Sequence, residues 1–106
     1  MSADSQIFVP PSFVALYSDA RGRVQTTLAE LTARYELCED LANHLTEQAQ
    51  HLHHGAAVPS EEEILLRMHA GLASAESGVS ADEARWVTQR LAELLQWPMP
   101  SWPDAP

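Results

Sequence analysis

The 106-residue chain has the length of one domain, and its 45% hydrophobic content is ordinary for a globular protein. Fifteen acidic residues against six arginines and no lysine give a net charge of −9, which argues against nucleic acid or an anionic membrane surface as a partner. There is one cysteine, no signal-peptide pattern and no apolar run of roughly 20 residues that would cross a bilayer, so we expect a cytoplasmic protein without a disulfide.

The N-terminal arm, residues 1–23, combines an extended segment with a short helical turn. Pro10 and Pro11 bias the residue before each of them away from the helical conformation. Ser12 is placed to cap a turn formed by "FVALY". The polar stretch "SDARGR" then separates this arm from the rest of the chain.

The clearest helix is expected over residues 28–54. Thr27 and Glu30 fit a capping box, in which the two side chains satisfy the free N–H groups of the first turn. Apolar residues then recur at alternating spacings of three and four, which predicts one continuous seam for packing against other helices. The seam consists of Leu28, Leu31, Tyr35, Cys38, Ala42, Leu45, Ala49 and Leu52.

Two further helices are expected over residues 61–77 and 81–97. Each starts after a capping box, formed by Ser60 with Glu63 and by Ser80 with Glu83. Their predicted buried faces contain Ile64, Leu65, Met68, Leu72 and Ala75 in the first, and Ala84, Val87, Leu91, Leu94 and Leu95 in the second. The Pro-rich tail, residues 98–106, is expected to be extended.

Three capped amphipathic helices with short connections predict a single all-α domain over residues 1–106. The simplest packing is a small antiparallel three-helix bundle with extended N- and C-terminal segments. No segment alternates with a period of two, so no sheet is expected.

Histidines and carboxylates share one face of the first long helix, at Asp40, His44, Glu47, His51 and His54. Residues at these spacings can hold one metal ion in pairs. The face is opposite the apolar seam, however, and one helix supplies two of the four ligands that a closed zinc site needs. We therefore interpret it as a solvated face and predict no metal or other cofactor. The alternative is a metal-binding or metal-sensing protein that uses His44, Glu47, His51 and His54.

Trp86, Arg90 and Trp97 lie about 120° from the predicted buried face of the last helix. Trp and Arg dominate the hot spots of protein interfaces, so these residues and Trp102 of the tail are candidates for binding a protein partner. Two alternatives stay open for each group. The surface of Trp86, Arg90 and Trp97 is covered either by a protein partner or by apolar residues of the N-terminal arm, namely Ile7, Phe8, Val9, Phe13 and Tyr17. The tail with Trp102 either docks in a groove of a partner, or it is disordered or folds back on the helices.

No catalytic residue is predicted. Phosphate-binding motifs of the G-x-x-x-x-G-K-[ST] and G-x-G-x-x-G types do not occur, and the four glycines are isolated. Cys38 occupies a seam position next to two acidic residues, which favours core packing over the exposed, electropositive setting of a reactive thiolate.

Three pieces of the chain, "SQIFVPPSFVALY", "ARYELCEDLANHLTE" and "EARWVTQRLAELLQWP", resemble a family of short, uncharacterised proteobacterial proteins that often carry the label "ATPase with chaperone activity". Because the phosphate loop of common ATPases is missing, the resemblance implies binding to an ATP-driven chaperone and not ATP hydrolysis. The leading hypothesis is a non-enzymatic interaction module, an adaptor or regulatory protein that binds a protein partner or self-associates.

Overall fold

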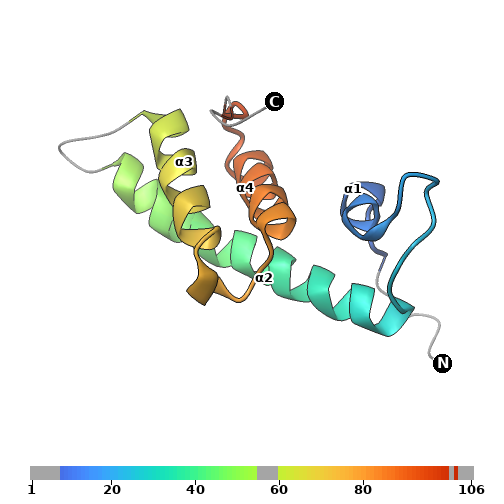
Figure 1. The fold of residues 1–106 in the computed structure, drawn as a ribbon. Coiled ribbons are helices and arrows are strands. Elements are labelled where there is room, and N and C mark those ends of the chain that lie inside the picture. The colour runs from blue at the N-terminus through green and yellow to red at the C-terminus, as the bar shows by residue number, and fades with distance from the viewer. Residues whose placement is uncertain (1–7, 55–59, 101, 103–106) are drawn as a thin grey trace. The chain divides into compact units, whose positions relative to one another are not determined.

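The computed structural model describes residues 8–54, 60–100 and 102, and within them all regular structure is helical. Helix α1 covers Pro11–Val14, α2 Leu28–His53, α3 Glu61–Leu72 and α4 Ala81–Leu95; two 3-10 helices, η2 and η3, cover Ala15–Tyr17 and Ala75–Ser77 (Figure 1). The all-α prediction is confirmed. Among the described residues, no helix is both long enough and apolar enough to span a bilayer.

The chain divides into two compact units, residues 1–37 and 38–106, and the boundary lies within α2. In the first unit, α1 begins at Pro11, one residue before the predicted cap, because proline fits the first helical position. The buried ring of Phe13 packs against Tyr17 and Tyr35, with ring centroids 5.6 Å apart in both pairs.

The polar stretch after η2 forms an ordered loop. The Asp19 carboxylate accepts hydrogen bonds from the backbone N–H groups of Arg21 and Arg23, both at 2.9 Å, and these bonds lower its pKa. Gly22 adopts a positive φ of 81°, which glycine tolerates without a steric penalty. An isolated antiparallel bridge between Ser18 and Val24 closes the loop.

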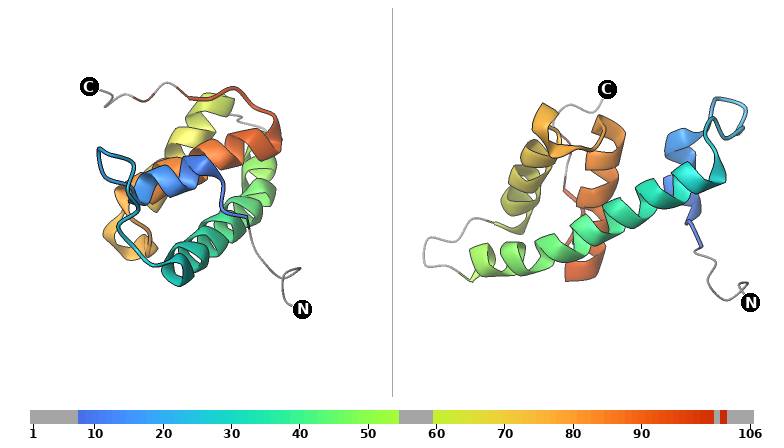
Figure 2. Two further views of the ribbon diagram at one scale, coloured as in Figure 1. Left: turned by 90° about the vertical axis from the view of Figure 1, so that its right-hand side faces the viewer. Right: turned by 90° about the horizontal axis from the view of Figure 1, so that it is seen from below.

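In the second unit, α3 and α4 run antiparallel and pack side by side, while the part of α2 from Cys38 onward crosses them (Figures 1 and 2). The expected antiparallel bundle of three helices is not confirmed. The buried positions of this part of α2 are small: Cys38, Ala42 and Ala49. Small side chains at a helix contact allow the two axes to come close together.

All three predicted N-terminal caps form. The hydroxyl groups of Thr27, Ser60 and Ser80 each accept a hydrogen bond at 3.1 Å from the backbone N–H three residues later. At Ser80 the box is complete, because Glu83 Oε1 accepts from the Ser80 N–H at 2.9 Å. Glu63 instead pairs with Arg67.

Three helix ends differ from the prediction. Helix α2 ends at His53, one residue before the predicted end. Helix α3 ends at Leu72 and not at residue 77, because Ser74 donates its hydroxyl to Gly71 O at 2.8 Å and a separate 3-10 turn follows. Helix α4 ends at Leu95 and not at residue 97. The sequence also overestimates the seam of α2, since Leu28 and Leu52 at its two ends are exposed.

Candidate interaction site

The C-terminal segment starts with a sharp turn that the end of α4 imposes. Gln96 adopts the left-handed conformation, with φ 60° and ψ 39°. Its N–H donates to Glu93 O at 3.1 Å, and the N–H of Trp97 donates to Ala92 O at 2.9 Å. These two bonds are the Schellman motif, which satisfies the last carbonyl groups of a helix and turns the chain back toward it. The motif places Trp97 against the helix that it follows.

Trp97 packs on the buried cluster of Leu65, Leu91 and Ala92, where α3 and α4 meet. Its ring lies 4.9 Å from the imidazole of His53 at the end of α2. The Nε2 atom of His53 lies 3.8 Å from Glu61 Oε2 at the start of α3. One tryptophan of the C-terminal segment therefore contacts groups from three helices.

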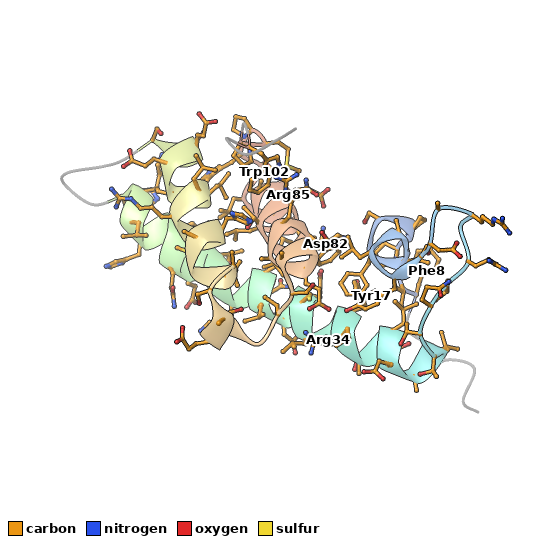
Figure 3. The ribbon with its side chains drawn as sticks, viewed as in Figure 1. Phe8, Tyr17, Arg34, Asp82, Arg85 and Trp102 are labelled. Atoms are coloured by element: carbon orange, nitrogen blue, oxygen red, sulfur yellow. The ribbon has the colours of Figure 1, made fainter. Side chains whose placement is uncertain are left out.

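Trp102 contacts one side chain of α3 and one of α4. The guanidinium carbon of Arg85 is 4.5 Å from the centre of the Trp102 indole, and the centre of the His69 ring is 4.7 Å from it in an edge-on arrangement. Figure 3 shows Arg85 of α4 next to Trp102. A cation over an indole face is attracted by the ring's negative potential. Between the two tryptophans, Pro100 is buried. At the described positions the tail thus folds back on its own helices.

Arg90 points to α2 instead of to solvent. Its Nε and Nη2 atoms donate to Glu39 Oε1 and Oε2, both at 2.9 Å, and its Nη1 donates to Glu93 at 3.1 Å. The hydrogen bonds from Arg90 hold the pKa of Glu39 below its ordinary value, and those to Glu39 raise the pKa of Arg90. Arg90 therefore links α4 to α2 as a structural element of the second unit.

Trp86 is buried, with 6% of its surface exposed. The helical wheel predicts Trp86 far from the buried face of α4, but in the structure the buried residues cover a much wider sector of this helix. They are Glu83, Ala84, Trp86, Val87, Thr88, Leu91 and Ala92. As the molecule stands, Trp86 is not presented to a partner. The predicted contact between the N-terminal arm and α4 joins the two units and stays a prediction; Phe8 is 78% exposed, and Ile7 lies outside the described residues.

The histidine face of α2 is exposed at each of its candidate ligands: His44, Glu47, His51 and His54. Shallow hollows of the surface are lined by Asp40, His44 and Glu47, and by Glu47 and His51. Within the described part of one chain, no group of three or more His, Cys, Asp or Glu side chains is arranged to hold a metal ion. Cys38 is buried, in agreement with its seam position.

The residues that hold the tryptophans were not predicted from the sequence. His53, His69 and Arg85 come from three different helices, and no motif connects them. A partial signal existed for Trp97, which falls just before a proline and two positions after the last apolar residue of α4. That position is typical of the residue that makes the hydrophobic contact of a helix C-terminal motif.

Comparisons of this chain with protein-family models, with curated proteins and with solved structures find no match. The resemblance to the proteobacterial family therefore stays an expectation.

Proposed function

We propose that the protein is a non-enzymatic interaction module, an adaptor or regulatory protein, whose second unit binds a proline-flanked tryptophan segment of a partner. The observation that carries this proposal is the seating of Trp102 against Arg85 and His69. The chain's own tail has the composition of a ligand, because each Trp in "WPMPSWP" is followed directly by a Pro. It occupies a surface that a similar segment from outside can take.

The chemistry of this surface fits an exchangeable ligand. Arg85 and His69 offer polar atoms and flat faces to an indole, an arrangement that binds aromatic side chains without enclosing them. Proline restricts the backbone before binding, so an extended Pro-containing segment loses less conformational entropy when it docks. Contacts of this strength, about 0.5–2 kcal/mol each, stabilise a reversible contact and not a permanent one.

The negative charge of the chain, −9, favours a partner with a basic surface around its tryptophan segment. It disfavours nucleic acid, which we do not propose as a ligand. The proposal includes a cytoplasmic location. A chaperone-associated role is the form that the sequence resemblance suggests.

The test is a binding assay with the tail as a peptide. A fluorescein-labelled peptide of residues 98–106 is titrated with the full chain and with its Trp102→Ala variant, and fluorescence anisotropy is measured. Because the variant's own tail competes less, we expect it to bind the peptide several-fold more tightly than the original chain does. Adding Arg85→Ala to the variant should weaken binding by about 2- to 30-fold, the equivalent of about 0.5–2 kcal/mol. Adding Arg67→Ala, an exposed arginine outside the site, should leave the affinity unchanged.

A peptide in which Trp102 is replaced by Ala is the matched ligand control and should not bind. The proposal is wrong if the labelled peptide fails to bind the Trp102→Ala chain. It is equally wrong if Arg85→Ala and Arg67→Ala have the same effect, because the binding would then be general attraction to the chain.

A further inference from the structure

The exposed side of α2 in the second unit carries acidic residues and histidines in strict alternation. In chain order these residues are Asp40, His44, Glu47 and His51. At 100° per residue they fall within a sector of about 60°. The opposite side of the same helix carries its buried residues, Cys38, Ala42 and Ala49. Among the described residues of the second unit, these four side chains are exposed.

One copy of this face supplies half of a metal site. His44 and Glu47 are three residues apart, a spacing at which two helix side chains reach one ion. A closed zinc site takes four ligands. Within the residues that the structure describes, one chain does not assemble even three. A second copy of the chain supplies the two missing ligands only if its own His44 and Glu47 lie at the same height along the helix axis as those of the first copy.

An antiparallel pairing of two α2 helices does this. The spacings four, three, four repeat every seven residues, which keeps a face directed at a partner helix. If the two-fold axis passes between residues 45 and 46, His44 of each copy lies level with Glu47 of the other. Asp40 of each copy then lies level with His51 of the other. Every level pairs an acid with an imidazole.

A parallel pairing has the opposite result. Each residue would then lie level with its own counterpart, so that Asp40 meets Asp40 and Glu47 meets Glu47. Like charges directly opposite each other are destabilising. The order of acids and histidines along α2 therefore favours the antiparallel arrangement.

We propose that this face binds a divalent transition-metal ion of the zinc class between two antiparallel copies of the chain. The ligands are the imidazole of His44 and the carboxylate of Glu47 from each copy, two nitrogens and two oxygens, a donor set that zinc accepts. Each chain carries a net charge of −9, so two copies repel one another without the ion. Self-association is therefore metal-dependent. The site uses none of the residues that hold the C-terminal segment. A negative result for zinc binding would therefore leave the proposed peptide binding unaffected, and the reverse is also true.

The experiment measures molar mass and metal content together. The full, untagged chain is stripped with EDTA, dialysed, and analysed by light scattering with and without zinc chloride, and bound zinc is counted in the separated peak. We expect a monomer without zinc and a dimer holding one zinc ion per two chains with it.

Two exposed single substitutions, His44→Ala and Glu47→Ala, should keep the protein monomeric in the presence of zinc. The matched control is His54→Ala, which changes an exposed histidine just after the end of α2 that is not one of the four ligands. This variant should dimerise as the original chain does. The double exchange of His44→Glu with Glu47→His should restore the dimer, since each copy again contributes one imidazole and one carboxylate. Circular dichroism checks that the helical content of every variant is unchanged.

Three results would overturn the proposal. The first is an unchanged molar mass when zinc is added. The second is one zinc ion bound to each monomer, which would place the site within a single chain. The third is a zinc-dependent dimer that His44→Ala and Glu47→Ala leave intact, because its ligands would then lie elsewhere.

Discussion

The ion pair between Arg90 and Glu39 allows the sharpest test of how the second unit is held together. The pair joins α4 to α2 through two donor atoms of one guanidinium, and its side chains are 33% and 22% exposed. Fully exposed pairs contribute about 0–1 kcal/mol, and hydrogen bonds to charged groups about 1.5–3 kcal/mol. For this partly buried, two-pronged pair we expect a coupling energy of about 1–2 kcal/mol.

The assay is a double-mutant cycle with Glu39→Gln and Arg90→Gln, in which the free energy of unfolding is measured in urea at pH 7. The control cycle uses Glu63 and Arg67 on α3, whose contact is just as short but whose side chains are 51% and 60% exposed. For this exposed pair we expect about 0.3–0.5 kcal/mol. A coupling energy at Glu39 and Arg90 no larger than that of the control would show that partial burial does not strengthen this pair.

The same pair predicts a dependence on pH. Its hydrogen bonds with Arg90 lower the pKa of Glu39 in the folded state below the ordinary value of 4.5. A carboxylate whose pKa is lowered by folding contributes its full stabilising free energy to the folded state when the pH is above its unfolded-state pKa. This contribution is lost as the pH falls through its folded-state pKa. The destabilisation caused by Glu39→Gln should therefore be constant from pH 7 to about pH 5 and shrink below about pH 4. A destabilisation that stays the same down to pH 2 would contradict this.

Three further substitutions give expected changes in urea unfolding. Ser80→Ala removes the cap of α4 and should cost about 1 kcal/mol; no loss would mean that the box contributes nothing. Gln96→Gly relieves the left-handed residue that ends α4 and should stabilise by about 0.5–1 kcal/mol; a loss would contradict the positive φ. Trp102→Ala should cost about 0.5–1.5 kcal/mol and remove part of the indole fluorescence; unchanged stability would mean that the tail does not dock.

The helix starts could be predicted because their determinants are local. Thr27, Ser60 and Ser80 each accept a hydrogen bond from the backbone N–H three residues later. Because both partners lie within four residues of sequence, the sequence pattern alone predicts the bond. The helix ends were less accessible. Gln96 is not a residue type that favours a positive φ, and the hydrogen bond of Ser74 to Gly71 competes with helix continuation without a clear sequence signature.

The candidate site depends on contacts that no periodicity contains. Glu39 and Arg90 are 51 residues apart in the sequence, and the partners of Trp97 and Trp102 come from three different helices. A helical wheel also gives the direction of the most apolar face but not the number of segments that surround a helix. For that reason the helical wheel predicted that Trp86 lies outside the core. In the structure Trp86 is buried.

Nuclear Overhauser effects from the tryptophan rings show whether the C-terminal segment is docked on the helices. If the C-terminal segment lies on α3 and α4, the indole protons of Trp102 should show effects to His69 and Arg85, and those of Trp97 to His53. Indole rings that show effects only to their own neighbours in the sequence would contradict the docked tail and the binding surface inferred from it.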